Sequence, residues 1–242
     1  MIPKTIHYCW FGGKPLPKST VKCINSWKGF FPDYEIIEWN ELNYNVRKIP
    51  YTSEAYDAKK YAFVSDYARF DILYQYGGVY FDTDVEVIKP FKDILERGSF
   101  MGCEIDGGEL GINVNPGLGM AANPGMSVYK EILDFYALQH FLNADGSINA
   151  ETVVKKITRL LLNKGMKNYK GIQKVEGITI YPKDYFNPFQ DSTGVLTITK
   201  NTRSIHWYTK SWIDPQVRFK SVITRPFHRL FGDNCFDRLK RK

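Results

Sequence analysis

The stretch that decides the fold is Gly77–Ile88, which reads GGVYFDTDVEVI. Its two glycines end a long helical pattern, and Val79–Phe81 is a short apolar strand that stops at two acids. Asp82 and Asp84 therefore lie at the carboxyl end of a strand, where open α/β sheets bind their ligands. An isolated Asp-x-Asp sequence is usually a solvated turn, and the alternative is a site for a hard divalent cation.

Strand and helix patterns alternate along the rest of the chain. The expected strands are Thr5–Trp10, Tyr34–Trp39, Val79–Phe81, Val85–Ile88, Phe100–Glu104, Ile178–Tyr181, Val195–Thr199 and Ser204–Trp207. The expected helices are Pro17–Gly29, Glu54–Tyr76, Met126–Phe141 and Ala150–Asn163. This alternation predicts an α/β fold, with a mixed sheet covered by helices on both faces.

Two interpretations stay open for the glycine-rich stretch Asp106–Gly125. It reads DGGELGINVNPGLGMAANPG, which is typical of a flexible loop. Alternatively, it contributes polar side chains to the binding of a second substrate. The candidates for that role are Asp106, Glu109, Asn113 and Asn115.

Charge is concentrated at the C-terminal end of the 242 residues. The net charge is +7, and the segment 215–242 holds eight Lys or Arg against two Asp, so this segment supplies +6. We expect a body of residues 1–214 and a basic, partly amphipathic tail of residues 215–242. Contact with an anionic membrane surface and a solubilising role both fit such a tail, in which Pro226 and Gly232 interrupt any long helix. Because no nucleic-acid motif accompanies the charge, we do not expect a nucleic-acid partner.

Other features of the sequence indicate a cytoplasmic protein. No apolar run reaches the 18 or so residues of a membrane span, and the N-terminus lacks the features of a signal peptide. The four cysteines match no zinc spacing and are expected to be reduced. They are Cys9, Cys23, Cys103 and Cys235.

A second charged pair precedes the acids within the expected helix. Asp66 and Arg69 belong to the sequence Ser65-Asp66-Tyr67-Ala68-Arg69, and their i, i+3 spacing places them on one helical face. One interpretation is a surface ion pair of little energetic value. The other is a carboxylate that binds sugar hydroxyls, beside a guanidinium that binds a phosphate or that carboxylate.

Taken together, these elements resemble a known family. The segment Tyr61–Pro90 contains S-D-x-x-R followed by L-x-x-x-G-G-x-Y-x-D-x-D. This is similar to the signature of the DXD-containing sugar-binding glycosyltransferases of the family-32 type, which include bacterial capsular polysaccharide transferases and Och1-like mannosyltransferases. The glucosyltransferase domains of large clostridial toxins are related to them. The resemblance implies a single GT-A-type domain, which is a Rossmann-like mixed sheet flanked by helices.

Two outlying segments extend the resemblance. Ile2–Gly13, IPKTIHYCWFGG, resembles the opening strand of the family, and Ser204–Trp212, SIHWYTKSW, resembles its C-terminal H-x-W-x-x-S-W sequence. By this resemblance, Trp10 stacks on the nucleotide base and His206 completes a metal shell. The alternatives are a core tryptophan and a structural histidine.

The resemblance also implies the composition of the site. The residues expected to bind a nucleotide sugar are Trp10, Gly12, Tyr61, Ser65, Asp66, Arg69, Asp82, Thr83, Lys210, Ser211 and Trp212. Asp66, Arg69, Asp82 and Asp84 are expected to be catalytic. The expected ligands of Mn²⁺ or Mg²⁺ are Asp82, Asp84 and His206.

The implied function is a metal-dependent, retaining glycosyltransferase of bacterial capsular or surface polysaccharide synthesis. It would move a sugar from a nucleotide diphosphate sugar, with UDP expected, to a hydroxyl of a glycan or lipid-linked acceptor. The alternatives are a GDP-mannose-dependent mannosyltransferase and a non-catalytic protein that binds nucleotide sugars. If the tail binds lipid, the protein would lie peripherally at the inner face of the cell membrane.

Overall fold

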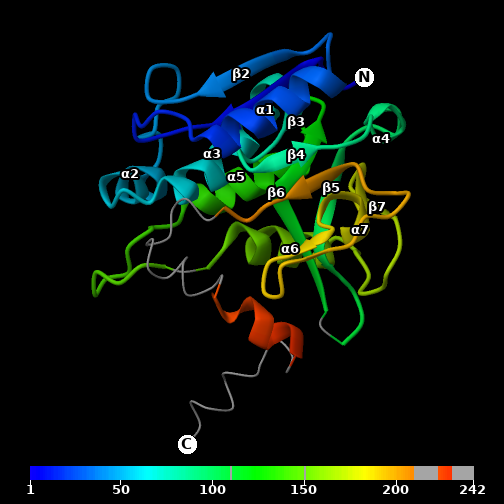
Figure 1. Ribbon diagram of the computed structural model, residues 1–242. Helices are drawn as coiled ribbons and strands as arrows, with labels where there is room; N and C mark the ends of the chain where they lie inside the picture. Colours follow the sequence, from blue (N-terminus) through cyan, green and yellow to red (C-terminus); the bar gives the residue numbers. More distant parts are fainter. Residues whose placement is uncertain (110, 150, 210–222, 231–242) are drawn as a thin grey trace, which may run out of the picture.

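A mixed sheet of seven strands forms the centre of this computed structural model (Figure 1). The structure describes residues 1–109, 111–149, 151–209 and 223–230. The strand order is β2-β1-β3-β6-β5-β8-β7, in which β1 runs parallel to β2 and β3, β5 runs parallel to β8, and the other pairs are antiparallel. The strands of this sheet are β1 (Thr5–Cys9), β2 (Glu35–Trp39), β3 (Gly78–Tyr80), β5 (Phe100–Asp106), β6 (Ile112–Ala122), β7 (Gln173–Val175) and β8 (Ile178–Tyr181).

Two short antiparallel pairs and eight helices surround the sheet in the described ranges. One pair joins β4 (Val85–Val87) to β11 (Ser204–His206), and the other joins β9 (Phe189–Gln190) to β10 (Val195–Leu196). The helices are α1 (Lys18–Phe30), α2 (Pro50–Asp57), α3 (Tyr61–Tyr76), α4 (Lys92–Glu96), α5 (Ser127–Ala137), α6 (Val153–Asn163), α7 (Lys183–Phe186) and the helix of residues 223–230. This arrangement confirms the predicted α/β fold with a mixed sheet flanked by helices.

The sheet separates two hydrophobic cores. Successive strand residues point to opposite faces, so Val79 and Phe81 enter one core while Tyr80 enters the other. Helices α1, α4 and α7 cover the first core, and α2, α3, α5 and α6 cover the second (Figure 1). Both faces of β3 are therefore buried, and this burial fixes the position of Asp82, which follows Phe81.

The expected single helix Glu54–Tyr76 is wrong, because the chain forms two helices there. Helix α2 begins at Pro50 and ends at Asp57, and α3 begins at Tyr61. Between them Lys59 adopts a positive φ of 57°, and the Lys60 amide donates to the Ala55 carbonyl. No Gly or Pro marks this break, so hydrophobic periodicity alone could not reveal it.

Most of the glycine-rich stretch is a strand rather than a loop. Its residues Ile112–Ala122 form β6, the longest strand of the sheet, which pairs with both β3 and β5. Glycine is needed at position 119 because its φ is +132° and an added Cβ would lie 2.8 Å from the Phe81 ring. Later in the chain, the expected strand Val195–Thr199 is limited to Val195–Leu196, and β7 was not expected.

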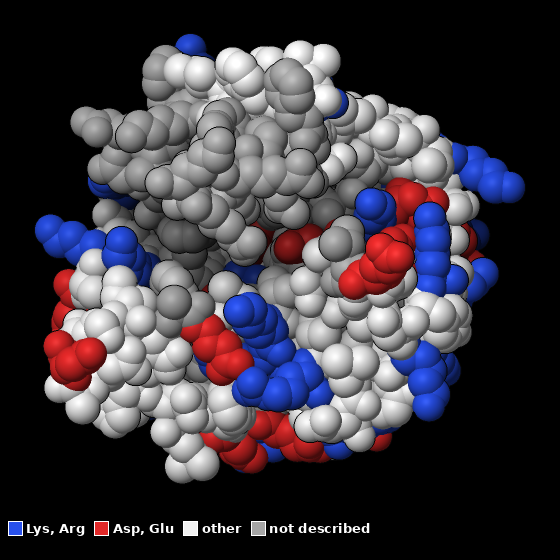
Figure 2. Space-filling view, turned by 90° about the horizontal axis from the view of Figure 1, so that it is seen from below, with Lys and Arg blue, Asp and Glu red and all other residues white. Residues whose placement is uncertain are grey.

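The face that carries the helix of residues 223–230 is seen from below in Figure 2. Lys, Arg, Asp and Glu side chains are interspersed on this face, and acidic atoms are visible at the floor of a hollow. The predicted boundary between residues 214 and 215 lies outside the described residues. The division into a body and a tail therefore stays a prediction.

A buried histidine ties β1 to β2 and to the end of α3. Trp39 Nε1 donates to His7 Nδ1 over 3.0 Å, and His7 Nε2 lies 3.0 Å from the Gly77 carbonyl oxygen. These contacts fit a neutral ring that carries its proton on Nε2. Burial lowers the pKa of His7 to about 4, because a charged ring would lose its hydration.

We predict that His7 makes the fold sensitive to acid. Between about pH 6.5 and pH 4 the unfolded chain binds a proton at His7 and the folded chain does not, so stability falls as pH falls. At 1.36 kcal/mol per pKa unit, the free energy of unfolding loses about 3 kcal/mol through this residue. Urea unfolding should show that the stability difference between wild type and His7→Gln shrinks by about this amount from pH 7 to pH 4. An unchanged difference would contradict the prediction.

Candidate functional site

The two acids of the Asp-x-Asp sequence lie in a tight turn between β3 and β4. The Val85 amide donates to the Asp82 carbonyl over 3.0 Å, and the Asp82 amide donates to the Gly117 carbonyl over 3.3 Å. The turn sends the two carboxylates to different partners. The chain thus presents one acid to α3 and the other to β11.

Arg69 holds the first acid and Asp66 together. Its guanidinium lies 3.0 Å from Asp66 Oδ1 and 3.2 Å from Asp82 Oδ1, and its Nε donates to the Ser65 carbonyl. The Arg69 side chain is only 4% exposed and lies over the Tyr80 ring. The i, i+3 pair is therefore not a surface ion pair, and it is continuous with the acids after β3.

Burial shapes the protonation of this cluster. It raises the pKa of Asp66 to about 6, although the Arg69 charge opposes that rise. Burial also raises the pKa of Asp82, again against the attraction of Arg69. One guanidinium thus offsets two carboxylates, whose side chains remain 14% and 27% exposed and so accessible to a ligand.

The second acid pairs with a histidine from the far end of the chain. His206 Nε2 lies 3.1 Å from Asp84 Oδ1, because β11 pairs with β4 and sets His206 opposite Val85. Asp84 Oδ2 accepts hydrogen bonds from the Thr209 amide and hydroxyl, at 2.8 and 3.1 Å. Burial raises the pKa of Asp84, but these partners outweigh it and lower the pKa to about 2.

The pair of Asp84 and His206 fits a divalent cation. A carboxylate oxygen and an imidazole nitrogen 3.1 Å apart can bind one ion from the same side, and Mn²⁺ and Mg²⁺ accept such ligands. His206 Nδ1 is buried and has no hydrogen-bond partner among the described residues. Within the described ranges, no group of three or more His, Cys, Asp or Glu side chains is placed to hold a metal ion. Asp82, the third expected ligand, is directed to Arg69.

Of the residues expected to bind the nucleotide sugar, Gly12, Tyr61 and Ser65 lie where the chain leaves β1 and where α3 begins. A Cβ on Gly12 would lie 2.3 Å from the Tyr61 ring, so these two residues are in close contact. Ser65 Oγ donates to the Tyr61 carbonyl. Trp10 is half-buried against the core that α1 covers, and its Nε1 donates to the Lys14 carbonyl. Thr83 is half-buried in the turn between the acids, whereas Lys210, Ser211 and Trp212 lie outside the described residues.

Residues of β6 complete the surroundings of Asp82. A Cβ on Gly117 would lie 2.1 Å from Asp82 Oδ2. Asn115 Oδ1 accepts from the Gly117 amide, and Asn115 Nδ2 donates to Glu104 over 2.7 Å. Asn115 is thus the member of the expected acceptor group that lies against the acids, whereas no signal in the sequence indicated Gly117.

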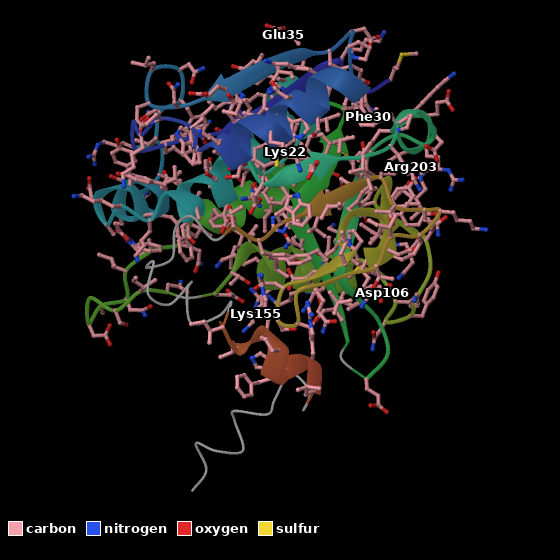
Figure 3. The ribbon with its side chains drawn as sticks, viewed as in Figure 1. Lys22, Phe30, Glu35, Asp106, Lys155 and Arg203 are labelled. Atoms are coloured by element: carbon pink, nitrogen blue, oxygen red, sulfur yellow. The ribbon has the colours of Figure 1, made fainter. Side chains whose placement is uncertain are left out.

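The other three residues of that group lie along the hairpin of β5 and β6. Asp106 is at the end of β5, where its Oδ2 accepts from the Lys183 amide over 3.3 Å (labelled in Figure 3). Glu109 is exposed beyond that end, and Asn113 is half-buried in β6. A role for these residues in acceptor binding stays a prediction.

Comparisons with known proteins agree with the resemblance read from the sequence. Residues 17–101 match the family described as "Glycosyltransferase sugar-binding region containing DXD motif". The chain is 31% identical over 111 residues to inositol phosphoceramide mannosyltransferase 1 of Schizosaccharomyces pombe, covering 41% of this chain and 33% of that protein. It is 34% identical over 98 residues to inositol phosphoceramide mannosyltransferase 3 of the same yeast, covering 39% and 27%. The chain spans about a third or less of these relatives.

A solved structure is also similar to the chain. The PaToxG glycosyltransferase has a TM-score of 0.48 at 19% identity, over 68% of this chain and 70% of that one. The match of residues 17–101 to the family contains Asp66, Arg69 and the Asp-x-Asp sequence. Residues 17–101 are therefore similar to the glycosyltransferase sugar-binding regions that contain a DXD motif.

Proposed function

We propose that this protein is a metal-dependent glycosyltransferase that moves a sugar from a nucleotide diphosphate sugar to a hydroxyl group. The observation that carries the proposal is one cluster of charged side chains, in which Arg69, Asp84 and His206 are buried. In it, Arg69 binds Asp66 and Asp82, and the next acid, Asp84, pairs with His206. Asp66 and Arg69 offer a carboxylate and a guanidinium, which suit sugar hydroxyls and phosphates. Asp84 and His206 suit the cation that accompanies a diphosphate.

In the proposed mechanism each acid has a separate task. Asp84 and His206 would hold Mn²⁺ or Mg²⁺, with Asp82 assisting through its nearby charge. A bound divalent cation neutralises the negative charge that develops on a departing diphosphate. Asp66 would accept hydrogen bonds from the donor sugar, and Arg69 would fix Asp66 and Asp82 in position. Thr209 would orient the Asp84 carboxylate.

We propose that the reaction retains the configuration of the transferred sugar. Asp66 and Asp82 are engaged with Arg69, so neither is a free nucleophile. A front-face route fits this arrangement, with the leaving phosphate taking the proton of the acceptor hydroxyl. The product of an α-linked donor would then be α-linked.

The proposed donor and acceptor rest on the resemblance and on the relatives rather than on contacts in the site. We propose a UDP-sugar donor, with GDP-mannose as the alternative that the two yeast mannosyltransferase relatives favour. The names of these relatives specify a lipid acceptor, which supports a lipid-linked glycan acceptor here, as in the synthesis of a bacterial surface polysaccharide. A protein that binds nucleotide sugars without catalysis would show the same binding but no hydrolysis of the donor.

A peripheral location at the cytoplasmic face of a membrane would suit that acceptor. In the helix of residues 223–230, Arg225 and Arg229 turn toward the body and bind Asp191 and the Thr193 carbonyl. Ile223 and Leu230, which are 52% and 76% exposed, lie on the outer side. The helix thus turns its charged side toward the protein and its apolar side toward solvent, which supports contact with lipid. In the part of the chain that the structure describes, no helix is long and apolar enough to span a bilayer.

The metal site can be tested through Asp84. We predict that Asp84→Asn lowers hydrolysis of the donor sugar at least 100-fold, because it removes the charge that would hold the cation. Calorimetric titration of wild type with UDP and with GDP should show Mn²⁺-dependent binding of one of them, and Asp84→Asn should lose that dependence. Asp134→Asn, an exposed acid on α5, is the control. Nucleotide binding that is equal with Mn²⁺ and with EDTA would refute the proposal.

Gly117 offers a test that changes no polar group. We predict that Gly117→Ala reduces donor hydrolysis at least tenfold, because the new methyl group displaces the Asp82 carboxylate from Arg69. A crystal structure of the variant should show the displaced carboxylate. Gly29→Ala is the matched control, since nothing lies within 4 Å of the Cβ it would gain. Full activity in Gly117→Ala would show that the position of Asp82 is unimportant.

The lipid contact makes a separate prediction. Vesicles of phosphatidylcholine with phosphatidylglycerol should sediment the full chain, and Leu230→Glu should weaken this binding about tenfold by placing a charge in the apolar surface. Leu42→Glu, at a leucine that is 95% exposed and belongs to the loop after β2, is the control. Equal sedimentation of both variants and wild type would refute the proposed membrane contact, and the proposed reaction would stand.

A further inference from the structure

A buried lysine outside the described site lies close to it. Lys156, on α6, has a side chain with no exposed surface. Its ammonium donates to the Glu151 carbonyl and lies 3.7 Å from Glu151 Oε2. A fully buried lysine is rare unless its charge is needed, because burial of an ammonium ion costs several kcal/mol.

The ammonium of Lys156 faces two tyrosines of the second core. It lies 5.8 Å from the centre of the Tyr51 ring and 5.4 Å from that of Tyr136. These rings pack edge to face on each other, and their hydroxyls are fully buried with no hydrogen-bond partner among the described residues. The chain thus brings an ammonium and two phenols from three helices to one place beneath α3.

The charge that these groups share is that of Asp66. Burial is the main reason that the pKa values of Tyr51 and Tyr136 are raised, and the negative charge of Asp66 adds to that rise. Burial lowers the pKa of Lys156, and the Asp66 charge opposes this effect. The geometry agrees with this, because Tyr136 also packs edge to face on Tyr67, the residue after Asp66 on α3, with the ring centres 5.9 Å apart. Asp66 therefore has Arg69 as its ion-pair partner and lies within electrostatic reach of Lys156.

The balance of charges shows why a second cation is needed. Arg69 lies within 3.2 Å of two carboxylates, Asp66 and Asp82, so its single charge is divided between them. Glu151 does not saturate Lys156, because its other oxygen binds Arg159 over 2.6 Å and the side chain is partly exposed. Lys156 is a second positive charge that acts on Asp66, beside that of Arg69.

We propose that Lys156 is a positioning residue of the donor site, which fixes the orientation of the Asp66 carboxylate through its charge from the side of α6. The inference rests on the proposed function, in which Asp66 binds sugar hydroxyls. Lys156 itself touches neither the sugar nor the diphosphate. Its loss therefore affects the sugar part of the donor and leaves the nucleotide part unchanged.

The test compares Lys156→Met with Lys155→Met, which removes the exposed lysine next to it on the same helix (Lys155 is labelled in Figure 3). Wild type is first titrated with the UDP-sugar or GDP-sugar that it hydrolyses, and with the corresponding nucleoside diphosphate alone. We expect Lys156→Met to bind the nucleotide sugar about tenfold more weakly and the free nucleotide equally well. Lys155→Met should match wild type for both ligands.

A double-mutant cycle separates positioning from a purely structural role. If Lys156 acts through Asp66, then Lys156→Met should cause no further loss of sugar binding or hydrolysis in an Asp66→Asn background. Losses that multiply, or an equal loss of affinity for the free nucleotide, would overturn the proposal. So would a folded Lys156→Met that binds the nucleotide sugar as wild type does.

The stability of the variants decides the remaining case. Asp66→Asn should leave Lys156 underpaired, so adding Lys156→Met should raise the melting temperature above that of Asp66→Asn alone. If Lys156→Met and the double variant both fail to fold, Lys156 serves the fold alone and the proposal is wrong. A wild type that binds no nucleotide sugar would instead refute the proposed function, which keeps the two failures distinct.

Discussion

The site depends on one buried guanidinium that two carboxylates share. Arg69 remains charged at any ordinary pH, so its burial requires anions at fixed positions. Asp66 is one turn away on the same helix, whereas Asp82 reaches it only because β3 runs beside β1 and ends there. Removing one partner from a buried ion pair typically costs about 3–5 kcal/mol. The same interaction that orders the site therefore also fastens α3 to the sheet.

The turn after β3 explains how two neighbouring acids acquire different properties. Residues two apart on an extended strand would share a face, but the tight turn from Asp82 to Val85 separates them. Asp82 meets Arg69 and has a raised pKa because it is buried. Asp84 is also buried, yet its pKa is lowered to about 2 by His206 and Thr209. An acid held ionised in this way is suited to a cation.

The sequence reveals the local parts of this site and misses the parts that long-range pairing creates. The Asp-x-Asp sequence, the helix with Asp66 and Arg69, and the glycines that end it are contiguous, so their relationship is readable. Gly117 has no such signal, because only the pairing of β6 with β3 brings it against Asp82. The same stretch resembled a loop, since the glycines that turn the chain at its two ends cannot be told in sequence from Gly117 and Gly119, which pack closely within β6.

The segment that carries the family match does not contain the whole site. The match ends at residue 101, whereas Asn115 and Gly117 come from β6, and His206 and Thr209 come from β11 and the residues after it. The antiparallel pairing of β11 with β4 spans more than 100 residues of chain, and it alone places His206 beside Asp84. A cation held by that pair would therefore depend on a contact that forms only when β11 pairs with β4. Folding and the assembly of the proposed metal site are in this sense one event.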